Sequence, residues 1–238
     1  MNRQRERGSM DSWFKKKKAP DGTDIIRHEN VETTLGVTKG TVGFAQAREA
    51  VYERLFGKPL SVSHELLPLV PHIDVYIFKR SQGLKEVYSL VTGGMSDLEM
   101  TLPRGADKDV PRRVELIFYC SEPCDEYIAT VRWVAHFPHD SRSWLGLGHT
   151  MPNGTPPAPF WGSTELDTLF FLPPIVKKDQ TLPSELNLGG EPVHFLWVVP
   201  LTTAECNFKL TRGFDAMLNL FQQNRHPHVF DPHRKSYV

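Results

Sequence analysis

The sequence predicts an α/β fold in which helices pack on a mixed, largely antiparallel central sheet. Three observations predict it: strand-like runs within residues 72–119, an uninterrupted apolar run over residues 193–199, and segments of helical periodicity around them. No Gly/Ser linker or internal repeat divides the centre of the 238 residues, which favours one large core. We therefore expect a basic, flexible leader over residues 1–40 and a single folded domain over residues 41–238.

The first expected helix covers residues 43–57. Its apolar residues recur three or four positions apart with charged residues between them, so one face should be buried and the other exposed to water. The apolar face consists of Phe44, Ala47, Val51, Tyr52 and Leu55, and the charged face of Arg48, Glu49, Glu53 and Arg54. Gly57 and Pro59 should end the helix.

Three strands are expected within residues 72–119, in the runs HIDVYIFKR, YSLVTGGMSD and RRVELIFY. The first and third runs alternate with the two-residue period of a strand. One set of alternate residues, which includes Val75, Ile77, Leu116 and Phe118, should therefore line a buried face.

The middle run ends in an unusual turn. The pair Gly93-Gly94 permits positive φ and should redirect the backbone sharply. Ser96 or Asp97 should then cap backbone amides that the turn leaves free. The same residues begin a nucleophile elbow, but the sequence has Leu98 where that motif requires a second glycine.

A second helix is expected over residues 125–137, where Pro138 should end it. A Gly/Pro-rich loop follows over residues 144–161, and loops of this length are often functional or packed on themselves. Strands are expected over residues 168–172 and 193–199. The second of these is apolar throughout, which indicates a central strand covered on both faces.

The C-terminal part should contain a capped helix and an extended arm. Thr202 and Glu205 have the spacing of a capping box, a structural role that we favour over a catalytic one. A last helix over residues 212–223 should bury Phe214, Met217, Leu218 and Phe221. Residues 226–238 are too rich in proline for a helix and should lie across the surface as an extended arm.

Composition excludes several classes of partner. Lys plus Arg equals Asp plus Glu, at 28 each, and the pI is about 7.2, which argues against a nucleic-acid partner. No apolar run reaches the length of a bilayer, and the Arg-rich start lacks the apolar stretch of a secretion signal. The glycines form no phosphate-binding motif. We expect a cytoplasmic protein that binds neither nucleic acid nor membrane and uses no cofactor.

Cysteines and histidines give weak indications of a metal site. Cys120, Cys124 and Cys206 are an odd number, which fits reduced thiols, and no second pair accompanies the first two. A zinc site needs three or four ligands that converge on one point. The local histidine groups do not have that pattern, and we expect them to be structural; they are His136 with His139 and Asp140, His72 with Asp74, and His226 with His228 and His233.

The loop around His149 is the strongest candidate site. It combines a titratable ring with Asn153 and flanking aromatic residues that include Trp161, and such a loop could close over a pocket or present an anchor to a partner. Alternatively, His149 and Asn153 could hydrogen-bond their own loop and hold it shut. A second alternative is an uncharacterised hydrolase or metal-dependent enzyme that uses His149 with Asp97 or His136.

Five segments together resemble the Suppressor of fused family, in the form found as stand-alone bacterial proteins. They are the Gly94-Met95-Ser96-Asp97 turn with the RVELIFY strand, Gly148 to Gly154, TELDTLFFLPP, FLWVVPLTTAE, and Val229 to His233. They follow the family's order from about Thr41 to Val238, and residues 1–40 have no counterpart. The resemblance implies a mixed α/β domain that corresponds to the first half of the animal protein.

The resemblance also implies a function. The animal protein binds and sequesters a transcription factor, and its bound peptide adds an extended strand in a cleft formed with a second domain. Stand-alone relatives are proposed to be immunity proteins that neutralise toxins. We therefore expect a non-catalytic protein-binding module whose partner is another protein, with an oligomeric state that the sequence leaves open. The expected partner-binding residues are Gly94, Ser96, Asp97, His149, Asn153 and Trp161.

Overall fold

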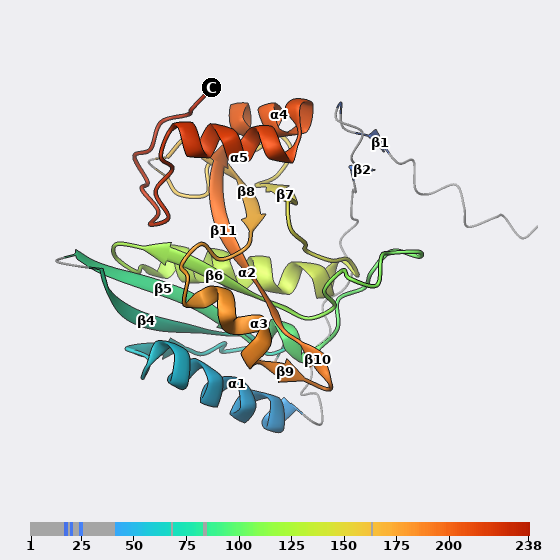
Figure 1. The fold of residues 1–238 in the computed structure, drawn as a ribbon, viewed down its shortest axis with the longest axis vertical. Helices are drawn as coiled ribbons and strands as arrows, with labels where there is room; N and C mark the ends of the chain where they lie inside the picture. The colour runs from blue at the N-terminus through green and yellow to red at the C-terminus, as the bar shows by residue number, and fades with distance from the viewer. Residues whose placement is uncertain are drawn as a thin grey trace, which may run out of the picture.

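The computed structural model describes residues 41–67, 69–82, 85–162 and 164–238, together with residues 17–18, 20 and 24–25. Seven strands form the central sheet in the order β3-β4-β5-β6-β11-β8-β7 (Figure 1). Neighbouring strands are antiparallel except β6 and β11, which are parallel. The predicted mixed, largely antiparallel sheet with packed helices is confirmed. The expected leader lies outside the described residues, apart from the short antiparallel pair β1 (Lys17–Lys18) and β2 (Asp24–Ile25).

The bounds of the elements are as follows. The sheet contains β3 (Ser61–Ser63), β4 (Asp74–Gln82), β5 (Lys85–Gly93), β6 (Val114–Cys120), β7 (Thr150–Pro152), β8 (Leu166–Leu172) and β11 (His194–Thr202), and β9 (Asn187–Leu188) pairs separately with β10 (Glu191–Pro192). The helices are α1 (Thr41–Phe56), α2 (Asp125–Asp140), α3 (Leu182–Glu185), α4 (Thr203–Arg212) and α5 (Phe214–Gln223), with 3-10 turns η2 (Met95–Asp97) and η3 (Asp179–Thr181).

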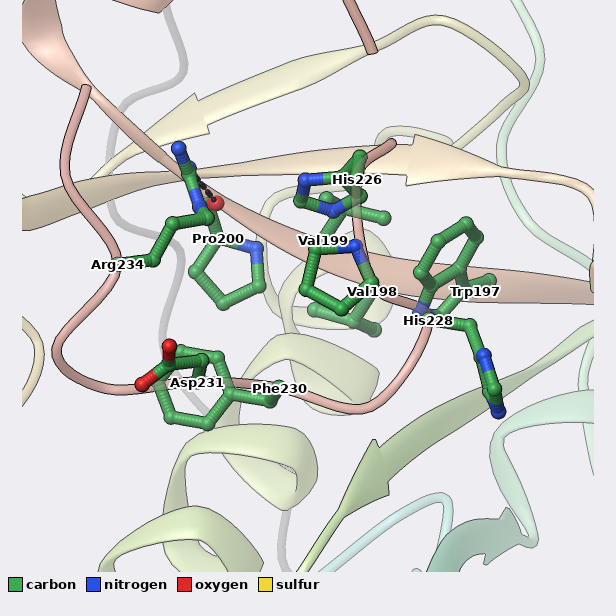
Figure 2. A pocket seen from close by; sticks show the side chains of 10 residues that line it. Trp197, Val198, Val199, Pro200, His226, His228, Phe230, Asp231 and Arg234 are labelled. Atoms are coloured by element: carbon green, nitrogen blue, oxygen red, sulfur yellow. Dashed lines mark hydrogen bonds between the residues drawn. The ribbon is translucent and has the colours of Figure 1, made fainter. Parts of the chain in front are cut away.

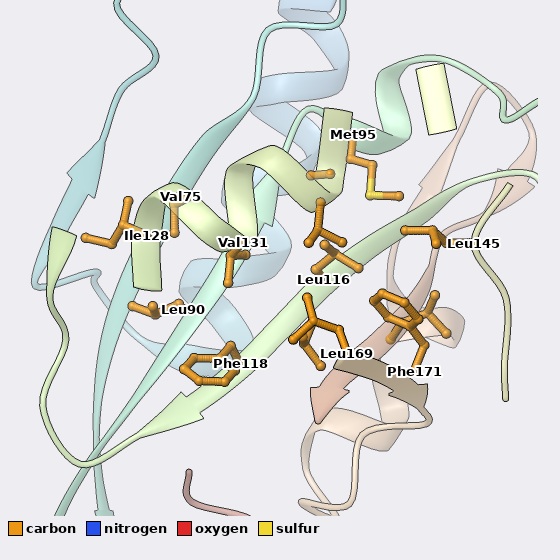
Figure 3. Close-up of a cluster of buried hydrophobic side chains, with 14 of the residues drawn as sticks. Val75, Leu90, Met95, Leu116, Phe118, Ile128, Val131, Leu145, Leu169 and Phe171 are labelled. Carbon is orange, nitrogen blue, oxygen red and sulfur yellow. The ribbon is translucent and has the colours of Figure 1, made fainter. Parts of the chain in front are cut away.

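Helices cover both faces of the sheet. On one face, α2 contributes Ile128, Val131, Val134 and Ala135 to a cluster with Leu90, Leu116 and Phe118 (Figure 3). On the other face, α1, α3 and α5 contribute Tyr52, Leu55, Leu182, Met217 and Phe221 to a second cluster. We call these the α2 face and the α1 face. The expectation of one buried face in β6 was therefore wrong, because Ile117 and Tyr119 are buried on the α1 face as fully as Leu116 and Phe118 on the α2 face.

Two helix predictions need correction. Helix α2 does not end at Pro138 but continues through it to Asp140. A proline this close to a helix end removes a single backbone hydrogen bond, and the Ser143 N–H donates to the Pro138 carbonyl at 2.7 Å, which holds the last turn. The predicted helix over residues 212–223 is α5, which begins two residues later, at Phe214, because Gly213 (φ 90°) separates it from α4. Leu218, which was expected to be buried, is 38% exposed.

Other local predictions are confirmed. Strand β11 is covered on both faces, and Thr202 and Glu205 form the capping box of α4: Glu205 N–H donates to the Thr202 hydroxyl at 3.2 Å, and Thr202 N–H donates to the Glu205 carboxylate at 3.0 Å. The loop over residues 144–161 is less irregular than expected, since it contains β7. No helix in the described part of the chain is both long and apolar enough to cross a membrane.

Candidate functional site

The turn after β5 is a closely packed corner of the fold. Gly94 adopts φ 120°, and a Cβ atom at this position would lie 1.9 Å from the backbone oxygen of His72. Glycine alone fits such a position. Met95, Ser96 and Asp97, which form η2, are all buried. The prediction that the glycine pair redirects the chain is confirmed.

The carboxylate of Glu115, on β6, holds this turn. It accepts hydrogen bonds from the backbone N–H of Gly94 (3.0 Å), the N–H of Ser96 (3.1 Å), the Ser96 hydroxyl (2.6 Å) and the Thr92 hydroxyl (2.6 Å). The side chain of Glu115 has no exposed surface. The sequence prediction that Ser96 or Asp97 caps the free amides was wrong, because Glu115 reaches them from the neighbouring strand.

Arg48 balances the charge of this carboxylate. Its Nη1 lies 2.5 Å from Asp97 Oδ1 and 3.9 Å from Glu115 Oε1. The prediction that Arg48 points to solvent was wrong: it is 3% exposed, because the two carboxylates compensate its burial. Burial lowers the pKa of Arg48, but Glu115 and Asp97 more than offset this and raise it above its ordinary value, so the guanidinium stays charged.

Arg113, the residue before β6, completes the cluster. Its Nη1 donates to the Ser96 carbonyl at 2.7 Å and to the Asp97 carbonyl at 3.1 Å. The cluster thus ties α1, β5 and β6 to one turn. Because Gly94, Ser96 and Asp97 are buried within it, they can hold the fold in shape but cannot touch a partner without local opening.

The loop around His149 is partly closed on itself. The Asn153 side-chain amide donates to the carbonyl of Ala158 at 2.9 Å and to that of Pro159 at 3.3 Å, so the expected self-contact of Asn153 is confirmed. The His149 ring lies edge-on to Trp144, with 5.3 Å between ring centroids. Burial, with a smaller effect of nearby Lys209, lowers the pKa of His149 to about 4. Within the described residues, no hydrogen bond to this ring is formed.

Trp161 lies inside an aromatic cage and not on the surface. It is 5% exposed. Its ring centroid is 6.0 Å from that of Phe118, 5.1 Å from that of Tyr127 and 4.8 Å from that of Phe230. Residues from β6, α2, the loop and the C-terminus thus meet at Trp161.

The sheet opens beside this cage. Strands β6 and β11 are paired over Val114–Ile117 and His194–Trp197. Beyond this register, β6 pairs with β5 and β11 pairs with β8. In the described structure the inner edges of residues 118–120 and 198–202 therefore face each other without strand pairing. We call the space between them the strand gap.

The C-terminal arm, residues 226–238, passes through the strand gap. The His228 ring contacts Tyr119 on the α1 face, at 5.9 Å between centroids. Two residues later, Phe230 lies in the cluster of the α2 face, and its N–H donates to the Tyr119 carbonyl at 2.8 Å. Phe230 also forms an isolated parallel bridge with Cys120. In Figure 1 the arm, drawn in red, descends from α5 toward the end of β6 and returns.

The far end of the arm is fixed to Glu205. Arg234 donates to both carboxylate oxygens of Glu205, at 2.6 and 2.8 Å, and to the Pro200 carbonyl at 2.9 Å. The N–H of Tyr237 also donates to Glu205, at 3.1 Å. The sequence predicted the capping role of Glu205 but not this second role. Figure 2 shows the crevice that remains between the arm and residues 197–200 of β11.

The comparisons with known proteins agree with this architecture. The family model described as Suppressor of fused protein (SUFU) matches residues 70–235, more than half of the chain. The chain belongs to the Suppressor of fused family. No curated protein matched it.

Three solved structures resemble this Suppressor of fused domain. A Suppressor of fused homologue from Neisseria gonorrhoeae is 16% identical, with a TM-score of 0.61 over 83% of this chain and 98% of that one. The Sufu–Fu complex contains a chain that is 13% identical, with a TM-score of 0.56 over 83% and 92%. Drosophila Suppressor of Fused is 13% identical, with a TM-score of 0.52 over 81% of this chain and 50% of that one. These similarities show the fold.

Four histidines of this Suppressor of fused domain have polar structural partners. His136 Nε2 lies 2.6 Å from Glu65, and His72 and His64 each contact Asp74. Within the described residues, no group of three His, Cys, Asp or Glu side chains could hold a metal ion. The described cysteines are free thiols, as expected. His136 and His139 do share α2, but they contact different segments, since His139 Nε2 donates to the Met95 carbonyl at 2.9 Å.

His139 makes a pH prediction possible. Burial lowers its pKa to about 4, although the bond to Met95 opposes this shift. Because the unfolded chain then binds the proton more readily, the contribution of His139 is complete above pH 6.5 and is lost as the pH falls toward 4. When the pH falls from 7 to 4.5, the unfolding free energy of the wild type should decrease by about 2–3 kcal/mol more than that of His139→Gln. Urea unfolding at both pH values measures this, and equal pH dependence in the two proteins would contradict it.

Proposed function

We propose that this chain is a non-catalytic module that binds another protein through the strand gap, as an immunity-type protein that neutralises a toxin or as a sequestering factor. The observation that carries the proposal is the occupant of the gap. An extended polypeptide segment lies there, held by a few backbone contacts and by side chains at both ends. A site of this kind suits recognition of an extended segment of another protein. The Sufu–Fu complex, a related structure, supports a protein as the partner.

The chemistry of the strand gap suits a peptide better than a small substrate. Its walls offer aromatic rings, the Tyr119 and Pro200 carbonyls as hydrogen-bond acceptors, and the carboxylate of Glu205. Such groups select an apolar side chain, backbone N–H groups and a cation. The three free cysteines support our placing the interaction in the reducing cytoplasm.

The predicted partner-binding residues take different places in this proposal. Trp161 belongs to the wall of the strand gap. His149 and Asn153 lie on the loop that leads to it, and their contact with a partner stays a prediction. Gly94, Ser96 and Asp97 keep the other end of β6 in place and would affect binding through the fold.

The direct test is functional capture. The tagged full chain is used to capture partners from the lysate of its native host, and it is co-expressed with any toxin gene adjacent to its own. Rescue of growth by the wild-type chain, with a stoichiometric complex of the two purified proteins, is the expected result. Neither rescue nor a complex would count against the proposal, and a stoichiometric metal in protein purified without a histidine tag would favour an enzyme instead.

His149→Ala separates a contact role from a structural one. If His149 serves to contact the partner, the variant binds more weakly while its melting temperature stays within about 2 °C of the wild type, because the ring then contributes little to the stability of the free protein. If His149 only packs its own loop, the melting temperature falls and the affinity of the folded protein is unchanged.

A further inference from the structure

The C-terminal arm defines what a competing partner must look like. We propose that the arm is an internal occupant of the strand gap. This proposal rests on the proposed function, and it implies that the partner segment that replaces the arm carries an aromatic residue followed four positions later by an arginine. In the arm these positions are Phe230 and Arg234. The arm would then regulate access to the site by competition.

The arm is attached to the sheet as a bound segment and not as a paired strand. Within the described residues, the backbone pairing of residues 227–238 with the sheet is confined to Phe230, whose N–H donates to the Tyr119 carbonyl and which forms the isolated bridge with Cys120. The arm begins just after Arg225, whose positive φ of 49° directs the chain away from the axis of α5. Segments with few backbone bonds to their surroundings open at a lower free energy than strands of the sheet.

The first anchor is the side chain of Phe230. It is 9% exposed and lies within the cage of Phe118, Tyr127 and Trp161, with ring centroids 5.3, 5.4 and 4.8 Å away. The tilted and edge-on ring contacts are the geometry that aromatic pairs prefer. A cage of three rings selects an aromatic side chain.

The second anchor is the guanidinium of Arg234. It makes two parallel hydrogen bonds to Glu205, whose side chain is fully buried, while the Arg234 side chain is 7% exposed. A planar fork that meets both carboxylate oxygens is a geometry that lysine cannot reproduce. A turn sets the distance between the anchors, since Arg234 N–H donates to the Asp231 carbonyl at 3.2 Å.

One polar atom of the cage and one of the arm are unsatisfied. Trp161 Nε1 and His228 Nε2 are buried and have no hydrogen-bond partner among the described residues. Buried polar groups without partners are unfavourable. A partner segment with an acceptor opposite Trp161 Nε1 would therefore make a bond that the arm does not make, which gives it an advantage in the competition.

Cys120 provides a native probe of arm opening. It is 1% exposed and bridges to Phe230, so a thiol reagent reaches it when the arm leaves. We expect Arg234→Gln to increase the rate of Cys120 modification at least tenfold, as followed by peptide mass spectrometry. The matched control is Lys235→Gln, because Lys235 is the neighbouring cation but its side chain is 82% exposed; this variant should stay within twofold of the wild type.

Cys206, which lies on α4 and is 6% exposed, distinguishes arm opening from unfolding. Its modification rate should stay near the wild-type value in Arg234→Gln. If Cys120 and Cys206 accelerate together, the arm is an integral part of the core and the proposal is wrong. If Arg234→Gln does not fold, Phe230→Leu tests the other anchor by the same two rates.

The specificity is tested with synthetic peptides. A labelled peptide of residues 226–238 should bind the Arg234→Gln protein at least tenfold more tightly than the same peptide carrying Arg234→Gln or Phe230→Ala. Equal binding of the three peptides, or none, overturns the proposed motif even if a partner has been captured. A concentration-dependent dimer of the wild-type chain that the peptide dissociates would assign the gap to a second copy and would also overturn it. If the peptides confirm the motif but capture and co-expression find no partner, the result counts against the proposed function and not against the motif.

Discussion

Glu115→Gln is expected to lower the free energy of unfolding by about 3–5 kcal/mol, because it breaks a buried charge network. The carboxylate accepts four hydrogen bonds, two of them from backbone N–H groups of the turn at Gly94 and Ser96. A glutamine of similar size has one acceptor oxygen, and its NH₂ group would face donors. It also removes part of the negative charge that compensates Arg48. Urea unfolding at pH 7 measures the change.

The matched control for this prediction is Glu86→Gln. Glu86 also forms a cross-strand ion pair, with Lys79, but its side chain is 61% exposed. Water and salt screen exposed ion pairs, so the control should be nearly as stable as the wild type. Similar small losses in both variants would mean that water reaches Glu115 in solution and that the turn is held in another way.

Sequence patterns predicted elements whose cause is local. The apolar run of β11 and the spacing of Thr202 and Glu205 each depend on residues within one segment, and the structure confirms both. The extended form of the arm was predicted for the same reason, since its prolines exclude a helix, but the expected course across the surface was wrong, because Phe230 is buried in the core. Its path through the strand gap depends on where β6 and β11 separate, and no pattern within the arm contains that information.

The predictions that were wrong concern residues whose surroundings are formed by segments distant in the sequence. Arg48 has the spacing of an exposed helix residue, and its burial follows from Asp97 and Glu115, which no helix pattern can include. Glu115 occupies an ordinary alternate position of a strand. A sequence signal existed, since a charged residue within the apolar run VELIFY requires a partner when both faces are covered. The prediction missed this because it assumed one exposed face.

The two buried acids fix opposite ends of the same architecture. Glu115 binds the turn that follows β5 at the closed end, where β6 and β11 are paired. Glu205 binds the arm at the open end, where these strands have separated. The partners of Glu115 belong mainly to the backbone and side chains of one turn. Glu205, in contrast, binds a segment whose place a segment of another protein could take. This difference supports our proposal that the open end binds the partner, while the closed end stabilises the fold.

Gly94→Ala is expected to destabilise the protein by more than about 3 kcal/mol or to prevent folding, because the added atom has no space and the backbone no relaxed alternative. The Cβ would lie 1.9 Å from the His72 carbonyl oxygen and 3.3 Å from the Ile73 Cα. Both are backbone atoms of the segment that leads into β4, so neither can move as a flexible side chain would. Thermal and urea unfolding of the purified variant measure the loss.

Gly57→Ala isolates the steric part of that loss. Gly57 also has positive φ, at 84°, but a Cβ there meets no atom within 4 Å. Its substitution should therefore cost about 1–2 kcal/mol, the price of the backbone conformation alone. The difference between the two variants measures the contact of the turn with residues 72–73. If both lose the same amount, the turn is free to move away from that segment, and Glu115 would no longer have a fixed set of amides to bind.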